Sequence, residues 1–438
     1  MALSLVTFAG ARLHVKGFSG IRKGDSGNDR ERTEKFIGMK LGTFKLLIPV
    51  VAITVQSNSA STIIPPFLDH LRIPVAALGG LVSLGPVLAL SSRLPVGMAY
   101  SRQRARLLIC IGILGMGITN FLYSFVNDSL GFAIVHSANG FAYGAVTTLY
   151  MAFYVDSLSP DENRNHAMGY YVGTLALGYS TGNFFGGLMA DHFGYGLTFQ
   201  MAAFLSLVPI ALLWLGYGPS EDKKENSRRE VRAEVGVRGL LRALLEPELA
   251  TVVIVALFLN LLHQMGGVFI SLYGLGVGMS LTQIGIIRAG YAGCNAITRP
   301  ISGHFVNKFG HRRLSYGGIP LQSIVLMLIP MFTGFGAIFA VYVFSGFMRA
   351  VVIVANAVGL VQDVDENKVR RGLASGVYNA AGDLGNILGP AMGGLIAQAT
   401  SIGGVFIVGP IGSTILFLFG MWAIRLARSN RPSARGGR

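Results

Sequence analysis

Cysteine and charge are both scarce in this chain. It has two cysteines in 438 residues, Cys110 and Cys294, and both fall inside apolar stretches. Neither a disulfide framework nor a zinc site is supported, because each needs several cysteine or histidine ligands at suitable spacing. Charged residues make up 13% of the chain and hydrophobic residues 52%. Too few polar groups remain to cover a soluble body of this size, so the composition predicts an integral membrane protein.

Enzyme signatures are missing as well. The sequence contains no Gly-x-x-x-x-Gly-Lys-Ser/Thr phosphate loop and no His-Glu-x-x-His zinc motif. The pattern Gly-x-Ser-x-Gly occurs once, at 178–182, but inside an apolar run and not at the strand-to-helix turn that a nucleophilic serine needs. We therefore expect neither an enzyme nor an ATP-driven pump, and no metal or cofactor. Residues 1–40 are polar and lack the apolar core of a signal peptide, so we expect no cleaved leader, with Met39 as an alternative start.

Apolar runs of the length needed to cross a bilayer, ~20 residues each, recur along the whole chain. They lie at 43–67, 74–96, 107–126, 130–155, 169–190 and 196–217, then at 249–272, 280–303, 315–334, 336–360, 373–397 and 404–424. The sequence thus predicts an all-α integral membrane protein with twelve transmembrane helices. Its expected parts are an N-terminal tail (1–40), a six-helix bundle (41–217), a linker (218–248), a second six-helix bundle (249–426) and a basic tail (427–438).

The two bundles are related by an internal repeat. Asp-Glu-Asn at 161–163 recurs at 365–367, and a set of glycines around Gly178 recurs around Gly385 at an offset of 207. Arg93-Leu-Pro-Val-Gly97 recurs as Arg299-Pro-Ile-Ser-Gly303 at an offset of 206. A period near half the chain length predicts two pseudo-symmetric halves rather than a solenoid.

The formal net charge of +15 is distributed unevenly across the membrane. Of the 36 Lys and Arg residues, 31 fall in segments on one side, Arg72 alone falls on the other, and four lie within spans. This asymmetry predicts that both termini, the linker and both Asp-Glu-Asn loops are cytoplasmic. Basic flanks beside anionic lipid explain the charge without a nucleic-acid partner. We expect a multi-pass protein of the plasma membrane, working as a monomer in the lipid bilayer.

Two segments of the sequence resemble signatures of a known protein family. The segment Gly303-His-Phe-Val-Asn-Lys-Phe-Gly-His-Arg-Arg313 resembles the loop signature Gly-x-x-x-Asp-Arg-x-Gly-Arg-Arg of the major facilitator superfamily. The first-half copy at 97–106 is degraded, with Ser101 in place of the family's Asp. Gly385-Asn-Ile-Leu-Gly-Pro-Ala-Met-Gly-Gly394 is similar to the Gly-x-x-x-Gly-Pro-x-x-Gly-Gly signature of the superfamily's drug exporters, although that signature normally lies in span 5. The resemblance implies two bundles that rock to give alternating access.

A second resemblance concerns anion transport. Arg93 and Arg299 resemble the paired arginines of nitrate-type members of the superfamily, and the stretch from Ala380 to Gly389 is similar to the Gly/Asn-rich signature of that group. Asp383 lies inside this stretch and would repel a small anion, and span 5 lacks the matching motif. This resemblance implies uptake or exchange of a small anion as an alternative.

Glycines spaced three or four apart mark one face of spans 5 and 11. Small residues on one helical face allow close helix packing in lipid. We expect these residues to pack the two halves against each other. They are Gly178, Gly182, Gly186, Gly385, Gly389, Pro390 and Gly393.

Polar side chains at helical spacing predict a central aqueous cavity that forms the substrate and ion pathway. The candidates are Gln56, Asn58, His136, Tyr143, His263, Gln264, Arg288, Tyr291, Asn295, Arg349, Asn379 and Asp383. A charge at mid-bilayer costs at least ~2.5–3.5 kcal/mol, so the charged members need a function or a partner. We expect Asp383 to pair with Arg288 or Arg349 in one state, and either to be purely structural or to open to substrate or a proton. His136 and His263 are alternative proton carriers or packing residues.

A third group of residues is expected to gate the cytoplasmic side. Asp156 and Asp363 end spans 4 and 10 at an offset of 207, on the same side as the basic loops of their own halves. They are expected to form latches, or else to be solvated charges. The gating candidates are Arg93, Arg102, Arg106, Asp156, Arg299, Lys308, Arg312 and Asp363.

The sequence predicts a secondary transporter, with proton-coupled export of a small organic solute or drug as the first interpretation. Uptake or exchange of a small organic or inorganic anion, nitrate-like or carboxylate-like, is the alternative. A non-transporting membrane sensor built on the same fold is a third.

Overall fold

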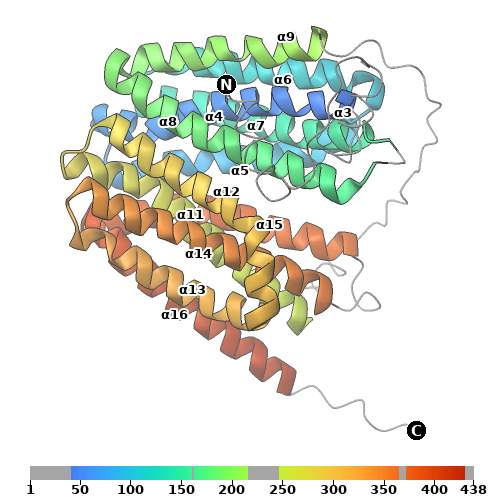
Figure 1. The fold of residues 1–438 in the computed structure, drawn as a ribbon. Helices are drawn as coiled ribbons and strands as arrows, with labels where there is room; N and C mark the ends of the chain where they lie inside the picture. Colours follow the sequence, from blue (N-terminus) through green and yellow to red (C-terminus); the bar gives the residue numbers. More distant parts are fainter. Residues whose placement is uncertain (1–40, 160–161, 216–245, 365–370, 430–438) are drawn as a thin grey trace, which may run out of the picture.

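The computed structural model describes residues 41–159, 162–215, 246–364 and 371–429. The predicted tail at 1–40, the linker (apart from 246–248) and the end of the basic tail lie outside these ranges. The described part of the chain is helical, and its long helices run roughly parallel to one another, with the first half above the second in Figure 1.

Seven helices form the first half. They are α3 (Leu41–Lys45), α4 (Leu47–His70), α5 (Val75–Ala99), α6 (Arg102–Tyr123), α7 (Ser129–Asp156), α8 (Arg164–Leu205) and α9 (Leu207–Leu215). α8 contains the fifth predicted span and the first part of the sixth, and the two meet at Gly194, which has a φ of 76°. A positive φ is accessible to glycine because it has no Cβ, and it turns the chain without a longer loop. α3 leads directly into α4, and α9 continues the span that begins after Gly194, so this half has six spans.

The second half repeats this arrangement. Its helices are α11 (Pro247–Gly276), α12 (Leu281–Phe309), α13 (His311–Met327) with a 3₁₀ turn (Ile329–Met331), α14 (Phe335–Gln362), α15 (Arg371–Ala399) and α16 (Ile402–Ser429). The described residues therefore form the twelve spans that the sequence predicts, in two sets of six, with ends within a few residues of the expected ones except where α12 and α16 extend further.

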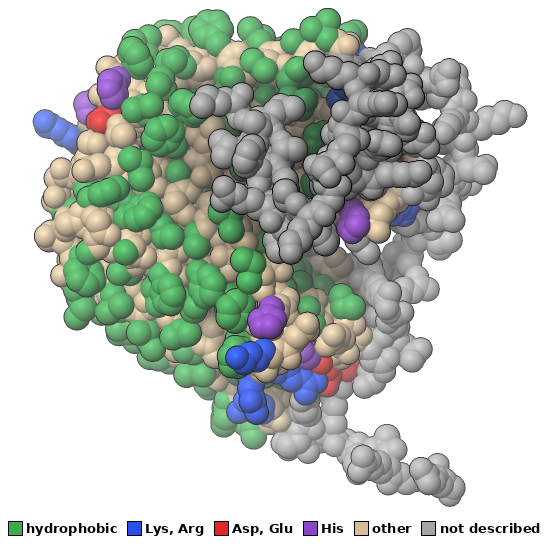
Figure 2. Space-filling model, viewed as in Figure 1, with side chains coloured by type: hydrophobic (Ala, Val, Ile, Leu, Met, Phe, Trp, Pro, Cys, Tyr) green, Lys and Arg blue, Asp and Glu red, His purple; other side chains and the backbone are tan. Residues whose placement is uncertain are grey.

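Hydrophobic side chains cover most of the face seen in Figure 2, and charged side chains gather towards its ends. Among the described residues, eight helical segments are long and apolar enough by composition to cross a membrane. One of them, His166–Leu215, runs through α8 and α9 and contains two spans. The long helices that this criterion omits are α7, α12 and α15. All three contribute polar side chains to the space between the halves, which lowers their hydropathy.

Two helix pairs make the main contacts between the halves, α5 with α15 and α8 with α12, and α4 also contacts α11. We call the two main pairs the α5–α15 seam and the α8–α12 seam. Within each half, α4 packs on α8 and α11 packs on α15. α5 and α12 begin at one end of the molecule, which we call the Pro74 end, and α14 ends at the other, which we call the Asp363 end.

Candidate functional site

A cavity of about 550 Å³ lies between the two halves. Nine of the predicted pathway residues line it, and Arg299, predicted as a gating residue, lines it too. The nine are Asn58, His136, Tyr143, His263, Gln264, Arg288, Tyr291, Asn295 and Arg349. Its size is within the range of about 300–1,000 Å³ that is usual for small-molecule sites.

Three predicted pathway residues lie elsewhere. Gln56 is fully buried in α4, and neither atom of its side-chain amide has a hydrogen-bond partner among the described residues. Asn379 is exposed on the part of α15 nearest the Asp363 end. Asp383 contacts the other half of the molecule, as described below.

The cavity also contains polar residues that the sequence did not single out. Asn139 lies one turn from His136 on α7, so the helical face of His136 could have revealed it. Tyr179 and Asn183 lie between the glycines of α8. Because the neighbouring glycines indicated helix packing, the sequence did not show that these two side chains line the cavity.

The three cavity arginines come from the second half and have neutral partners. Arg288 donates to the backbone oxygen of Gly267 at 2.8 Å and to Ser271 Oγ at 3.3 Å. Arg349 donates to Asn260 Oδ1 at 2.7 Å, and its buried Nε has no partner among the described residues. No Asp or Glu is among the described residues that line this cavity. The cavity therefore carries uncompensated positive charge.

The third cavity arginine, Arg299, donates through Nε to Asn295 Oδ1 at 3.1 Å. Asn295 in turn donates to the backbone oxygen of Gly346 at 3.2 Å, which ties this part of α12 to α14. A guanidinium has five N–H donors in a planar fork, so these contacts leave donors on each arginine for an anionic group in the cavity.

Aromatic rings form one wall beside the arginines. The rings of His263 and Tyr291 are stacked at 5.3 Å with an interplanar angle of 9°, and Tyr291 Oη contacts His263 Nδ1 at 2.9 Å. Tyr342 lies against Tyr291 with 4.8 Å between ring centroids. This wall can hold an apolar or aromatic body next to the charged groups.

His136 is held on both sides of its ring. Its Nε2 lies 3.2 Å from the backbone oxygen of Val82, and its Nδ1 lies 2.7 Å from Tyr123 Oη. A carbonyl oxygen only accepts, so we assign the proton to Nε2, and Nδ1 accepts from the tyrosine hydroxyl. Of the two roles expected for His136, this arrangement favours the packing residue.

The expected pairing of Asp383 with Arg288 or Arg349 is wrong for this state. Asp383 Oδ2 accepts instead from Arg93 Nη1 at 2.5 Å, so the ion pair crosses the α5–α15 seam. The Arg93 side chain is 40% exposed and that of Asp383 is 14% exposed. Helical faces identified the charged residues, but the partner depends on how the two halves dock, which the sequence pattern does not encode.

The expectation that the glycines pack the two halves together is also wrong for six of them. Gly178, Gly182 and Gly186 lie against α4, and Gly385, Gly389 and Gly393 lie against α11, each within its own half. The glycines that meet the opposite half are their neighbours Gly187 and Gly394. Adjacent residues in a helix point about 100° apart, so one glycine of each pair faces its own half and the other faces the partner. The backbone oxygen of Pro390 does lie at the seam, against Gly79.

The halves touch closely at the Pro74 end. A Cβ added to Gly187 would lie 2.8 Å from Gly285 Cα, and Thr282 Oγ1 donates to Asp191 Oδ2 at 2.7 Å across the same seam. The cavity is thus closed at the Pro74 end.

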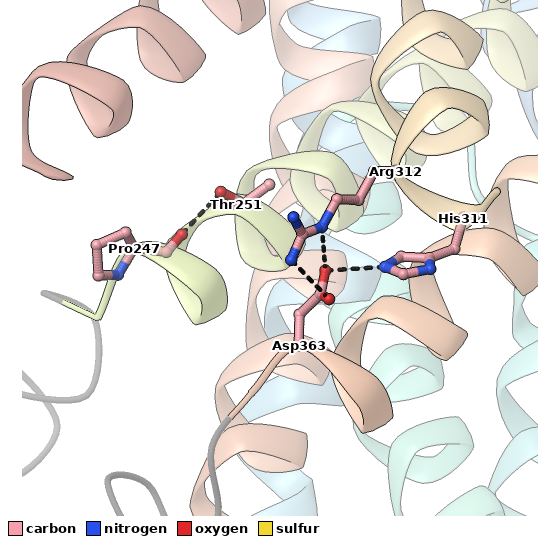
Figure 3. Close-up of polar contacts among 5 residues, drawn as sticks. All are labelled: Pro247, Thr251, His311, Arg312 and Asp363. Atoms are coloured by element: carbon pink, nitrogen blue, oxygen red, sulfur yellow. Dashed lines mark hydrogen bonds and ion pairs between the residues drawn. The ribbon is translucent and has the colours of Figure 1, made fainter. Parts of the chain in front are cut away.

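The two carboxylates expected to form latches, Asp363 and Asp156, have different kinds of partner. Asp363 accepts from Arg312 at 2.9 and 3.1 Å and lies 2.9 Å from His311 Nε2, which joins α14 to the start of α13 (Figure 3). Partial burial raises the pKa of the Asp363 carboxyl, but the hydrogen bonds and charges of Arg312 and His311 outweigh burial, so this pKa lies below its ordinary value.

In the first half, Asp156 accepts from the Tyr100 hydroxyl at 2.7 Å. Burial and this hydrogen bond raise the pKa of Tyr100, which keeps the hydroxyl a donor. Arg106 donates to the backbone oxygen of Trp214 at 2.8 Å and lies over its ring. Arg102 and Lys308 are exposed.

Comparisons with known proteins agree on one family. The sequence model of the Major Facilitator Superfamily matches residues 46–280 and 264–438. An uncharacterized MFS-type transporter of Methanocaldococcus jannaschii is 20% identical over 84% of this chain and 91% of its own length. Multidrug resistance protein 1 of Bacillus subtilis is 24% identical over 76% of this chain and 83% of its own length.

Two crystal structures show the same fold. The nucleoside transporter NupG superposes with a TM-score of 0.72 at 14% identity, covering 88% of this chain and 99% of that one. A bacterial homolog of the human lysosomal transporter Spinster, in an inward-facing and occupied conformation, superposes with a TM-score of 0.71 at 14% identity, covering 88% and 96%.

Proposed function

Because the chain belongs to the Major Facilitator Superfamily, we propose that it is a secondary transporter that carries a small organic anion through the central cavity by alternating access. The observation that supports an anion is the set of three arginines without a carboxylate among the described residues lining the cavity. Buried charges are retained in membrane proteins where they are paired or functional. A bound anion supplies the missing pairing, and the tyrosine wall accommodates an organic body.

We propose that the cavity is open to the cytoplasm in the conformation seen in this structure. Close contacts join the halves at the Pro74 end, and the opposite end carries the basic loops that the positive-inside rule assigns to the cytoplasm. We further propose efflux across the plasma membrane, because one relative is a multidrug resistance protein. In the coupling step, a proton would reach Asp383 once rocking separates it from Arg93.

Ligand-induced stabilisation of the detergent-purified protein tests the anion. Phthalate and phenyl phosphate are expected to raise its unfolding temperature, and neutral benzamide is not, because only a ligand that binds the folded state stabilises it. Arg288→Gln and Arg349→Gln should lose this response, whereas Arg102→Gln, at an exposed site outside the cavity, should keep it. Stabilisation by benzamide, or by tetraphenylphosphonium in place of the anions, would contradict an anionic substrate.

Transport is tested in proteoliposomes with radiolabelled phthalate. Counterflow is expected for the wild type and not for Arg349→Gln, and its absence in a wild type that binds phthalate would indicate a sensor. A pH gradient should drive accumulation between about pH 5.5 and 8, and Asp383→Asn should remove this concentrative step while leaving counterflow. Wild-type accumulation by Asp383→Asn would refute the coupling role.

A further inference from the structure

The two seams are equivalent under the internal repeat. Adding 207 to a position on α8 gives its counterpart on α15, and adding 206 to a position on α5 gives its counterpart on α12. In Figure 1, α8 and α12 lie where the upper and lower halves meet. If the same equivalent positions also touch on both seams, a contact on one seam identifies the corresponding pair of residues on the other.

Close backbone contacts show that they do. A Cβ added to Gly79 would lie 2.9 Å from Gly394 Cα, and one added to Gly187 would lie 2.8 Å from Gly285 Cα. Gly79 is the counterpart of Gly285, and Gly394 is the counterpart of Gly187. The same two positions therefore touch on both seams.

Hydrogen bonds give the same result one to two turns further along. Ser83 Oγ donates to the backbone oxygen of Ile387 at 2.7 Å, and Ser180 Oγ donates to that of Ala289 at 2.9 Å. Ser83 is the counterpart of Ala289, and Ile387 is the counterpart of Ser180. The two serines lie on opposite members of the pair, but the positions they join are equivalent.

The seams differ at the next matching position. On the α5–α15 seam, Arg93 is neutralised by Asp383 from the opposite half. The counterpart of Arg93 is Arg299, and the counterpart of Asp383 is Ala176. Arg299 and Ala176 both line the central cavity. A methyl group thus stands where the other seam has a carboxylate, and Arg299 donates to the neutral Asn295 on its own helix.

We propose that the anionic oxygen group of the substrate binds beside Ala176 and pairs with Arg299, in the position that the Asp383 carboxylate holds on the other seam. The small Ala176 side chain leaves the space, and Arg299 supplies the unused donors. This proposal rests on the proposed function, since it needs an anionic substrate. It places the charged end of that substrate between α8 and α12, so binding joins the two halves at a position where this seam has a methyl group and the other seam has a carboxylate.

The test places a carboxylate in this position. Ala176→Asp is expected to pair with Arg299 and to weaken binding of phthalate and phenyl phosphate by about tenfold or more, because the internal carboxylate competes for the arginine and repels an anion. Ala176→Asn is the matched control of equal size, and its loss should be several-fold smaller. Comparing phthalate with phenyl phosphate shows whether carboxylate or phosphate oxygens fit the position better.

The predicted closeness of position 176 to Arg299 can also be tested without a ligand. The unfolding temperature of Ala176→Asp should exceed that of Ala176→Asn, and the order should reverse when Arg299→Gln is added, because the new carboxylate is then buried without a cation. Equal binding of the probes by wild type and Ala176→Asp, or no reversal with Arg299→Gln, would overturn this inference alone. Failure of both anions to stabilise the wild type would instead refute the proposed function.

Discussion

At the level of single residues, the pairing of Arg93 with Asp383 separates the roles of two arginines that the sequence makes equivalent. Arg93 has a carboxylate partner across the seam, so its charge is cancelled within the protein. Arg299 has only neutral partners among the described residues and lies on the cavity wall. Of the pair that resembles the nitrate-type arginines, Arg299 is therefore the one available to a substrate.

The first prediction concerns the stability of this pair. Arg93→Ala and Asp383→Ala should each destabilise the protein in this state, and the double variant should lose less than the sum. We expect a coupling energy of about 1–3 kcal/mol, between the values typical of exposed and of buried pairs, because the Arg93 side chain is much more exposed than that of Asp383. A double-mutant cycle from denaturant unfolding in detergent measures it. Strict additivity would show that the contact contributes nothing.

The second prediction concerns the pH dependence of Asp363. Its folded pKa is lowered, so its stabilising contribution is fully present above the unfolded pKa and is lost as pH falls through the folded pKa. Wild type should therefore be more stable than Asp363→Asn at neutral pH, and the difference should shrink below about pH 4. Unfolding temperatures of both proteins across this range measure it. A gap independent of pH would indicate that the carboxylate charge is not involved.

At the level of the helices, the positions of α8 and α15 follow from which glycine faces which neighbour. Gly178, Gly182 and Gly186 bring α8 against α4, and Gly187 brings α8 against α12. Each helix thus contacts its own half on one face and the opposite half on the next. If the halves rock as proposed, only the contact with the opposite half has to separate.

The third prediction uses this distinction. Gly187→Val places a side chain where Gly285 and the backbone of α12 already lie, so it should favour states open at the Pro74 end. Gly173→Val, on the same helix in open space, is the control and should leave the present state unchanged. Reactivity of a cysteine introduced at Ser57, which lines the cavity, reports the shift when a reagent is added from the side of the Pro74 end. No change with Gly187→Val would mean that this contact does not hold the cavity closed.

The sequence was sufficient for the spans and the two halves, because hydropathy and an offset of 206–207 are local or repeated signals. It was also sufficient to identify Arg288 and Arg349 as cavity residues, because polar residues at helical spacing share a face. It was not sufficient for the partner of Asp383 or the neighbours of Gly186. Helical periodicity specifies a direction around one helix, whereas these contacts depend on the rotation and register of a second helix distant in the sequence.

At the level of the whole molecule, the proposed alternating access depends on the contacts between the two halves. The halves meet at the Pro74 end through backbone contacts and the Thr282–Asp191 hydrogen bond. In the proposed alternating access these contacts open while contacts at the Asp363 end form. The Asp363–Arg312 pair lies within the second half, so it can persist while the halves rock.

The fourth prediction tests the orientation of the molecule. In a variant with both Cys110 and Cys294 replaced by serine, Gln398→Cys at the Pro74 end should react with an impermeant maleimide on intact cells. Lys308→Cys, at the Asp363 end, should react only after permeabilisation. Both positions are exposed, so accessibility depends on the side of the membrane. The opposite pattern would invert the topology, and with it the assignment of the present state as open to the cytoplasm.

The three arginines of the cavity also have an electrical consequence. A charge that moves through the membrane field gains or loses ~2.3 kcal/mol per elementary charge per 100 mV. An empty cavity with uncompensated guanidinium groups carries net charge when access changes sides, whereas a cavity loaded with an anion carries less. The resting voltage of the cell would then act on the return of the empty carrier more than on the loaded step. In such a carrier the membrane potential, and not only the solute gradient, decides which side the unoccupied cavity faces.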